Sequence, residues 1–284
     1  MSNLNLIKEL RQKTGAGFLD CKNALKENNN DIDQSIDLLR KKGLAKATKK
    51  SSREAKEGAV GFYNNENISI ILKINSETDF SAKSDTFLDF VDFLGNFALK
   101  NNDSSLSLDK FMILKDNGKT ISELLTEMIA KIGENIIINQ LEVFDNKELK
   151  VNHYIHNPYR KNIGKIVSTV LFSSDDNSDK IKTFSKNLCM HIAASKPEAI
   201  DIDQLSSDII ENEKKIQVEM IKESGKPSNV IEKILEGKMK KFYSEITLLN
   251  QKFVIDPDKT VKEAINEFNS SNKFSLKDYS MISL

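Results

Sequence analysis

The sequence predicts an α+β fold, and three of its features lead to that class. Short apolar stretches near residues 59–74 and 151–172 are typical of strand pairs, and each precedes apolar residues at the three- and four-residue spacing of an amphipathic helix. The stretches 4–43 and about 207–249 have helical spacing throughout. We therefore expect antiparallel sheets covered by helices, with further helices at the start and late in the chain.

The first 43 residues are predicted to form a bundle of three short helices. Asp31, with Gln34 three residues later, makes a capping-box arrangement at the start of the third helix, and Gly43 is expected to end it. The basic stretch 44–58 is then expected to be a solvated linker, with contact to RNA or the ribosome as the alternative. The apolar residues at helical spacing in the bundle are Leu6, Ile7, Leu10, Ile32, Ile36 and Leu39.

Residues 59–147 are predicted to form the first half of a duplicated α+β core. A polar turn at residues 64–67 is expected to join the first two strands into a hairpin. The elements expected after this hairpin are helices over 87–98 and 121–132 and a strand over 136–144.

The second half of the core, within residues 148–284, is predicted to repeat the same plan. Strands over 151–156 and 164–172 are expected to flank a turn-rich loop at 157–160, and a helix should follow over 181–192.

A pair of long helices is predicted as an insertion in this second half, at about residues 207–249. Gly225, Lys226 and Pro227 interrupt the helical spacing there, which favours an antiparallel helical hairpin. From Phe274 onward the chain is expected to return as one last strand. The predicted domain division is thus 1–43, 44–58, 59–147 and 148–284.

Composition argues against several function classes. The 284 residues carry 42 basic and 42 acidic side chains, so a formal net charge of zero argues against a general nucleic-acid binder. Cys21 and Cys189 have no partner at metal or redox spacing, so we expect buried reduced thiols in a cytoplasmic protein. No apolar run is long enough to cross a bilayer, and no signal pattern begins the chain.

The sequence offers little for catalysis, and we expect neither an enzyme nor a cofactor or metal site. His153 and His156 stand three apart on a predicted strand, which directs them to opposite faces. No phosphate-binding loop of the Gly-Lys-Ser/Thr type and no Gly-x-Ser-x-Gly elbow occurs, so direct nucleotide binding of that kind is not expected.

The most informative stretch is the strand-to-helix corner that contains Asp79 and Phe80. Turns favour small or polar residues, and a large aromatic side chain normally seeks burial, so folding alone explains this pair poorly. The alternative is that Phe80 folds back into its own domain while Asp79 caps the next helix.

Five sequence runs, taken in order, resemble the bacterial translation elongation factor Ts family, the guanine-nucleotide exchange factors of elongation factor Tu. The resemblance weakens after about Glu267, and it implies a ubiquitin-associated-like N-terminal bundle and a protruding helical hairpin. The runs are Leu10-Arg11-Gln12-Lys13-Thr14-Gly15-Ala16-Gly17-Phe18-Leu19-Asp20-Cys21-Lys22-Asn23-Ala24-Leu25, Thr78-Asp79-Phe80, Ala193-Ala194-Ser195-Lys196-Pro197-Glu198-Ala199-Ile200, Gly225-Lys226-Pro227 and Ile234-Leu235-Glu236-Gly237-Lys238-Met239-Lys240-Lys241-Phe242.

The resemblance implies three sets of residues that contact elongation factor Tu. The first set would disturb the partner's Mg²⁺ site and comprises Thr78, Asp79, Phe80 and Ser81. The second would grip the partner's GTPase domain and comprises Arg11, Phe18, Leu19, Lys22, Ile132 and Gly133. The third matches less closely and comprises His156, Val254 and Ile255. For Phe18 and Leu19 the alternative is a place in the core of the bundle.

Several positions depart from the family pattern. Ser81 stands where Val is commoner, Ser76 where Cys is commoner, and Phe18 where Met is usual, while residues 157–162 replace a shorter glycine-rich link. The assembly with elongation factor Tu is expected to be either one-to-one or two-plus-two, the latter with a dimer of this chain. An RNA-binding module and a purely structural coiled-coil adaptor are the rival hypotheses, but an adaptor leaves the Asp79–Phe80 corner unexplained.

Overall fold

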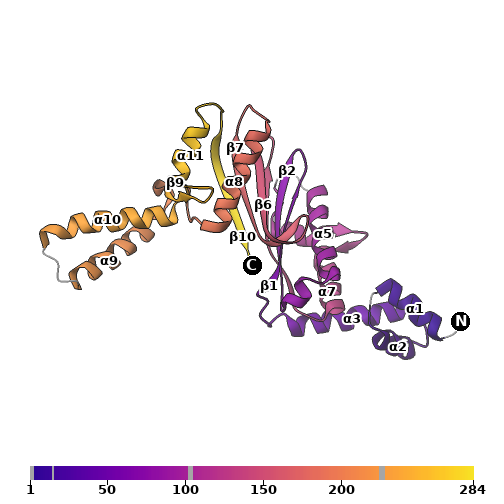
Figure 1. Ribbon diagram of the computed structural model, residues 1–284. Coiled ribbons are helices and arrows are strands. Elements are labelled where there is room, and N and C mark those ends of the chain that lie inside the picture. The colour runs from indigo at the N-terminus through magenta and orange to yellow at the C-terminus, as the bar shows by residue number, and fades with distance from the viewer. Residues whose placement is uncertain (1–2, 15, 102–104, 224–227) are drawn as a thin grey trace. The chain divides into compact units, whose positions relative to one another are not determined.

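The computed structural model describes residues 3–14, 16–101, 105–223 and 228–284, and its mixture of helices and antiparallel strands confirms the α+β class (Figure 1). The helices are α1 (Asn3–Thr14), α2 (Phe18–Glu27), α3 (Ile32–Lys50), α4 (Asp79–Ala82), α5 (Asp85–Lys100), α6 (Leu108–Ile113), α7 (Ile121–Ile132), α8 (Asp179–Ser195), α9 (Ser207–Glu223), α10 (Ser228–Ile246) and α11 (Val261–Phe268), with short 3₁₀ turns at Ile202–Gln204 and Leu248–Asn250. The strands are β1 (Glu57–Asn64), β2 (Ile68–Ser76), β3 (Lys115–Asp116), β4 (Lys119–Thr120), β5 (Ile136–Asp145), β6 (Lys150–Arg160), β7 (Ile163–Ser173), β8 (Lys252–Phe253), β9 (Asp256–Thr260) and β10 (Ser275–Ser283).

The chain divides into two compact units, each of which is described by itself. Unit 1 comprises residues 1–145, 157–166 and 282–284, and unit 2 comprises residues 146–156 and 167–281. Among the described residues, no helix is both long enough and apolar enough to span a membrane.

The sheet of unit 1 is built on the predicted β1–β2 hairpin. The side chain of Asn65 accepts hydrogen bonds from the backbone N–H groups of Asn67 and Ile68 and so closes the turn. β5 pairs antiparallel with the outer side of β2, and the start of β7 pairs with β1 through Val60 and Gly164. β2 is hydrogen-bonded on both sides and buried on both faces, and its sequence is accordingly rich in apolar residues.

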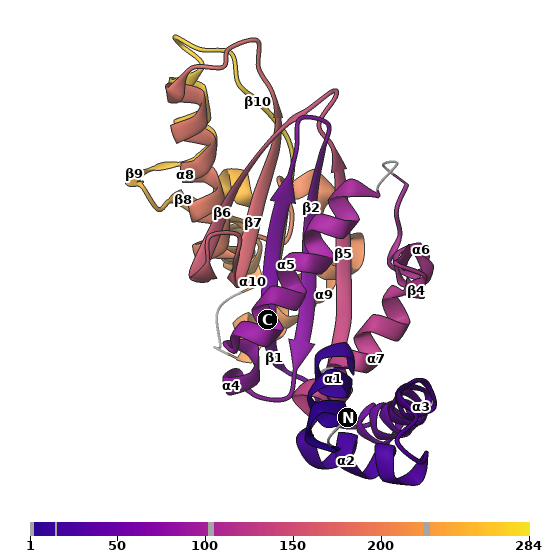
Figure 2. The same cartoon turned by 90° about the vertical axis from the view of Figure 1, so that its right-hand side faces the viewer.

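Helix α5 covers one face of this sheet (Figure 2). The ring of Tyr63 on β1 lies between sheet and helix and leaves no room for a side chain at Gly95, where a Cβ would stand 2.0 Å from it. Its hydroxyl donates to the Asp92 carboxylate at 3.0 Å, which satisfies the one polar group of this buried ring. The helix residues that are buried here are Phe87, Leu88, Phe90, Val91, Leu94, Gly95 and Ala98.

The prediction that the third helix ends at Gly43 is wrong. α3 begins at the predicted cap, where the side chain of Asp31 accepts from the Gln34 N–H at 2.9 Å, but it continues to Lys50. Gly43 is buried, and a Cβ there would lie 3.4 Å from the side chain of Ala130 on α7. Packing against α7 therefore carries the helix through a residue that often ends one, and the first part of the predicted linker is helical.

The prediction of a turn-rich loop at residues 157–160 is also wrong. β6 continues through these residues, and the turn to β7 lies at residues 161–162. Asn157 adopts a left-handed φ of 49° within the strand, which asparagine tolerates better than most residues. The guanidinium of Arg160 anchors the end of the strand, because it forms ion pairs with three α5 carboxylates, Asp85, Asp89 and Asp92.

Unit 2 has its own apolar core beneath α8 and α11. Aromatic rings make up much of it, with Phe184 and Phe268 stacked at 4.1 Å between centroids and Phe172 and Phe274 at 4.8 Å. The last strand expected after Phe274 is present as β10.

Helices α9 and α10 of unit 2 lie side by side (Figure 1). The ammonium of Lys238 on α10 donates to the side-chain oxygen of Gln217 on α9 at 2.8 Å. The break predicted at Gly225, Lys226 and Pro227 lies outside the described residues.

Candidate functional site

The corner between β2 and α5 exposes the aromatic side chain that the sequence singles out. β2 ends at Ser76, α4 forms a single turn, and the side chain of Phe80 is 85% exposed, the largest value among the large apolar residues that the structure describes. The alternative in which Phe80 folds into its own domain is therefore wrong. The cap of α4 is Thr78 and that of α5 is Ser84, so Asp79 caps neither helix.

Asp79 forms an ion pair with Lys83 one helical turn later, at 2.9 Å. The hydrogen bond from Lys83 lowers the pKa of Asp79, and the same bond raises the pKa of Lys83. Both groups are therefore charged at neutral pH, and both are available to solvent beside Phe80. The corner thus presents an aromatic ring with a charge of each sign next to it.

Ser81, like Ala82 after it, is buried, whereas Phe80 before it is exposed. The residue is 7% exposed, and its hydroxyl oxygen is buried without a hydrogen-bond partner. Its backbone N–H donates to the Thr78 hydroxyl at 3.2 Å, so Ser81 contributes to the N-terminal cap of α4. Ser76, the other departure near this corner, is also buried, and its hydroxyl donates to the Thr78 carbonyl at 3.2 Å.

A second corner, at the end of α7, contains Ile132 and Gly133. Gly133 ends the helix with a φ of 89°, and its carbonyl accepts a hydrogen bond from the ammonium of Lys50 at the end of α3. Gly133 is exposed and Ile132 is half-buried.

The two corners are joined by hydrogen bonds that the sequence gives no means of finding. The Glu134 carboxylate accepts from Thr78, and the Glu77 carboxylate accepts from the backbone N–H of Asn135 at 2.6 Å. These residues are more than fifty positions apart, and nothing in their spacing signals the contact.

The N-terminal helices expose all four residues expected to contact a partner there. Phe18 is 46% and Leu19 66% exposed, so the alternative in which they form the core of the bundle is wrong. Arg11 and Lys22 are exposed on α1 and α2. The core of this bundle consists instead of Ile7, Leu10, Cys21, Ala24 and Leu25.

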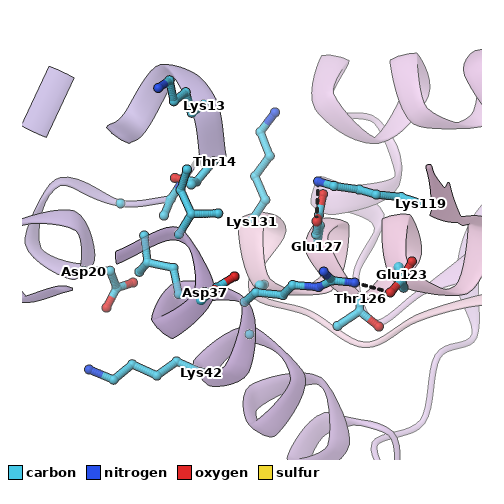
Figure 3. Close-up of a pocket in the computed structure, with 17 residues that line it drawn as sticks. Lys13, Thr14, Asp20, Asp37, Lys42, Lys119, Glu123, Thr126, Glu127 and Lys131 are labelled. Carbon is cyan, nitrogen blue, oxygen red and sulfur yellow. Dashed lines mark hydrogen bonds and ion pairs between the residues drawn. The ribbon is translucent and has the colours of Figure 1, made fainter. Parts of the chain in front are cut away.

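A pocket of about 210 Å³ lies between these helices and α7, all within unit 1 (Figure 3). Its charged walls are largely paired, since Arg40 binds Glu123 and the Lys119 ammonium lies 2.6 Å from the Glu127 carboxylate. Charges of both signs line it, so its chemistry favours neither an anionic nor a cationic ligand. The Arg40–Glu123 pair does, however, tie α3 to α7.

The remaining three candidate residues belong to unit 2. His156 is exposed, and its Nδ1 lies 3.2 Å from the Tyr154 hydroxyl. Val254 and Ile255, 48% and 45% exposed, form the turn between β8 and β9. The N–H of Val254 donates to Nδ1 of the buried His191, whose Nε2 lies 2.9 Å from the Gln251 side-chain oxygen. Burial lowers the pKa of His191, so its ring is neutral and accepts at Nδ1 while it donates from Nε2.

Metal-ligating and nucleophilic side chains do not gather at any of these places. Within the described parts of the chain, no group of three or more His, Cys, Asp or Glu residues could hold a metal ion. Cys21 and Cys189 are buried, and burial raises the pKa of both thiols.

Exposed apolar side chains beside charged groups, carried on firmly held corners, are typical of a protein-contact surface. The family model described as Elongation factor TS matches residues 77–283. The chain is 43% identical to the elongation factor Ts of Ruthia magnifica over 276 residues, which cover 95% of this chain and 88% of the relative. It is 41% identical to that of Brucella anthropi over 263 residues (93% and 85%) and 39% identical to that of Allorhizobium ampelinum over 262 residues (92% and 85%).

Identity at this level over most of both lengths shows that the chain belongs to the elongation factor Ts family, a family of translation elongation factors. The family resemblance of the sequence is thereby confirmed.

Proposed function

We propose that this protein binds elongation factor Tu in its GDP-bound form and promotes release of the GDP, so that GTP can be loaded. It acts in the cytoplasm as a guanine-nucleotide exchange factor and performs no covalent chemistry. The observation that carries the proposal is the 85% exposed Phe80 on a corner held by hydrogen bonds, in a member of the elongation factor Ts family.

The physical requirement for exchange is a partner that binds the distorted nucleotide site better than the intact one. A GTPase holds GDP through backbone amides and a Mg²⁺ ion, and these contacts are lost together. A thousandfold faster release requires a barrier lower by about 4 kcal/mol. Burial of one Phe side chain contributes about 1.5–3 kcal/mol, so Phe80 with supporting contacts is of adequate size.

Phe80 enters a cleft of the GTPase domain in this proposal, while Asp79 and Lys83 engage polar groups beside it. Thr78, which is exposed and caps α4, contacts the partner beside Phe80 in this proposal, whereas Ser81, whose side chain is buried, acts through the shape of the corner. Because binding and nucleotide release are coupled, bound GDP must also weaken the hold of this protein on elongation factor Tu.

A second contact with the GTPase domain is formed by Arg11, Phe18, Leu19 and Lys22, together with Ile132 and Gly133. All six belong to unit 1, as does the Phe80 corner. In unit 2, His156, Val254 and Ile255 form a third contact. We further propose that the N-terminal bundle is ubiquitin-associated-like, that α9 and α10 form a protruding hairpin, and that residues 59–147 and 148–284 are the two halves of the core.

The decisive experiment follows a fluorescent GDP analogue preloaded on elongation factor Tu after substoichiometric addition of this protein. We expect acceleration for the wild-type protein and at least a tenfold slower rate for Phe80→Ala, since most of the wedge's apolar surface is then lost. The melting temperature should stay within about 2 °C, because a side chain this exposed contributes little to folding.

Ile113→Ala is the matched control, because Ile113 on α6 is 70% exposed and belongs to the same unit. It should leave release unchanged. Absence of acceleration by the wild-type protein would end the proposal, and equal losses in both variants would show that Phe80 has no special role. The mass of the isolated complex distinguishes a one-to-one from a two-plus-two assembly.

A further inference from the structure

The corners at residues 77–78 and 134–135 exchange hydrogen bonds in a crossed pattern. The Glu134 carboxylate accepts hydrogen bonds from the backbone N–H and the hydroxyl of Thr78, and the Glu77 carboxylate accepts one from the backbone N–H of Asn135. Each corner therefore supplies one carboxylate and one backbone donor to the other. We call these four residues the corner latch.

Glu134 grips Thr78 with both carboxylate oxygens. Oε2 accepts from the Thr78 N–H at 3.0 Å, and Oε1 accepts from the Thr78 hydroxyl at 2.7 Å. The same hydroxyl accepts from the N–H of Ser81 as the cap of α4. Glu134 thus fixes the rotamer of the one side chain that starts the helix carrying Phe80.

Helix α4 needs such an external support. It has four residues, too few for a helix to be stable by itself. Phe80, its largest side chain, is exposed and therefore anchors nothing. The direction in which Phe80 points depends on Ala82, which is buried in the core, and on how Thr78 is held. The carbonyl of Thr78 also accepts hydrogen bonds from the Ala82 N–H and the Ser76 hydroxyl.

The latch is itself braced by the segment after α3. The side-chain amide of Asn135 donates to the carbonyl of Arg53 at 2.7 Å, and the Arg53 guanidinium lies 3.6 Å from the Glu77 carboxylate. The ammonium of Lys50 reaches the carbonyl of Gly133. Three segments of unit 1 therefore converge on the position where α4 begins.

We propose that Glu134 is a positioning residue for nucleotide exchange. It does not touch the nucleotide site of the partner, but holds α4 so that Phe80 is presented in the orientation that the cleft accepts. The inference rests on the proposed exchange function and extends it to a residue outside the contact sets. Preorganisation of this kind raises the rate of release without adding a contact.

The test compares Glu134→Ala with Glu134→Gln at varied concentrations of elongation factor Tu·GDP. For Glu134→Ala we expect the maximal rate of GDP release to fall about five- to tenfold, because two hydrogen bonds that hold Thr78 are lost. The half-saturating concentration of elongation factor Tu·GDP should change less than twofold. Glu134→Gln keeps an acceptor for the Thr78 N–H and a polar group for its hydroxyl, so it should recover to within about threefold of wild type.

Two further measurements separate positioning from general stability. Glu66→Ala, in the turn at the opposite end of β2, is the matched control and should leave every parameter unchanged. Amide hydrogen exchange of the free Glu134→Ala protein should be faster at Ser81 and Ala82, whose N–H groups bond to Thr78, while the melting temperature changes by less than about 3 °C.

Each alternative outcome overturns the inference in a recognisable way. If Glu134→Ala releases GDP from elongation factor Tu at the wild-type rate while Phe80→Ala does not, the nucleotide-exchange function stands and the positioning role of Glu134 is wrong. If Glu134→Gln is as slow as Glu134→Ala while its amide hydrogen exchange at Ser81 and Ala82 stays at the wild-type level, the charge of Glu134 acts on the partner directly and the positioning role is wrong. If the wild-type protein accelerates nothing, the exchange function fails, and the inference fails with it.

Discussion

At the scale of single residues, two serines three positions apart have opposite roles at the Phe80 corner. Ser84 caps α5, since its hydroxyl oxygen accepts a hydrogen bond from the Phe87 N–H, and its O–H donates to the Ser81 carbonyl. Ser81 is buried with a hydroxyl that finds no partner. A buried hydroxyl without a partner destabilises the folded state, so these two positions should respond oppositely to the same replacement.

We predict that Ser81→Val stabilises the protein by about 1–2 kcal/mol, because it removes an unpaired polar atom and buries an additional methyl group. Ser84→Val should destabilise it by about 1 kcal/mol through loss of the cap. Urea unfolding of the three proteins, monitored by circular dichroism, measures both changes. A destabilised Ser81→Val protein would show that the pocket around this hydroxyl cannot hold the extra methyl group.

Only part of the candidate site could be predicted from the pattern of residues in the sequence. Asp79 and Phe80 could be singled out because a charge and an aromatic at a strand end conflict with the usual demands of a turn. Their exposure could not be predicted, since it depends on what surrounds them. Glu134 could not be found at all, because its contact with Thr78 spans 56 positions and arises from the way β5 returns beside β2.

At the scale of elements, α3 shows a local rule overridden by packing. Glycine favours helix ends because it adopts left-handed backbone easily, and this is why the sequence predicts an end at Gly43. In the structure Gly43 lies inside a helix that packs on α7, with Arg40 and Glu123 paired one turn earlier. Strands β1 and β2 and helices α5 and α7 were predictable, because their apolar spacing and their tertiary contacts agree.

A single substitution tests whether Gly43 lies inside a helix or at a helix end. In the interior of a helix, Gly43→Ala should stabilise the protein by about 0.5–1 kcal/mol, because alanine loses less backbone entropy and its methyl group would lie at an ordinary 3.4 Å from Ala130. At a left-handed helix end the same change would destabilise instead. Thermal and urea unfolding give the sign, and Gly133→Ala, at a φ of 89°, is the control that should destabilise.

At the scale of the whole molecule, the two units differ in how they can respond to acid. All three histidines of the chain, His153, His156 and His191, fall within unit 2, and the residue ranges of unit 1 contain none. Burial lowers the pKa of His153 to about 4, with the nearby Lys186 charge adding to the effect, and burial also lowers the pKa of His191.

Mild acid should therefore loosen unit 2 and spare unit 1. The folded-state pKa of His153 lies below its unfolded value of about 6.5, so between these values the unfolded chain binds more protons and stability falls as the pH falls. For His153 alone the loss by pH 5 is about 2 kcal/mol, and His191 acts in the same direction. We expect amide protection, corrected for intrinsic rates, to drop between pH 7 and pH 5 in residues 167–281 but not in residues 16–101.

His153→Gln should reduce this dependence, while His156→Gln, a change at an exposed ring, should preserve it. An equal loss of protection in both units would assign the acid sensitivity to carboxylates shared by the whole chain, and not to the buried histidines.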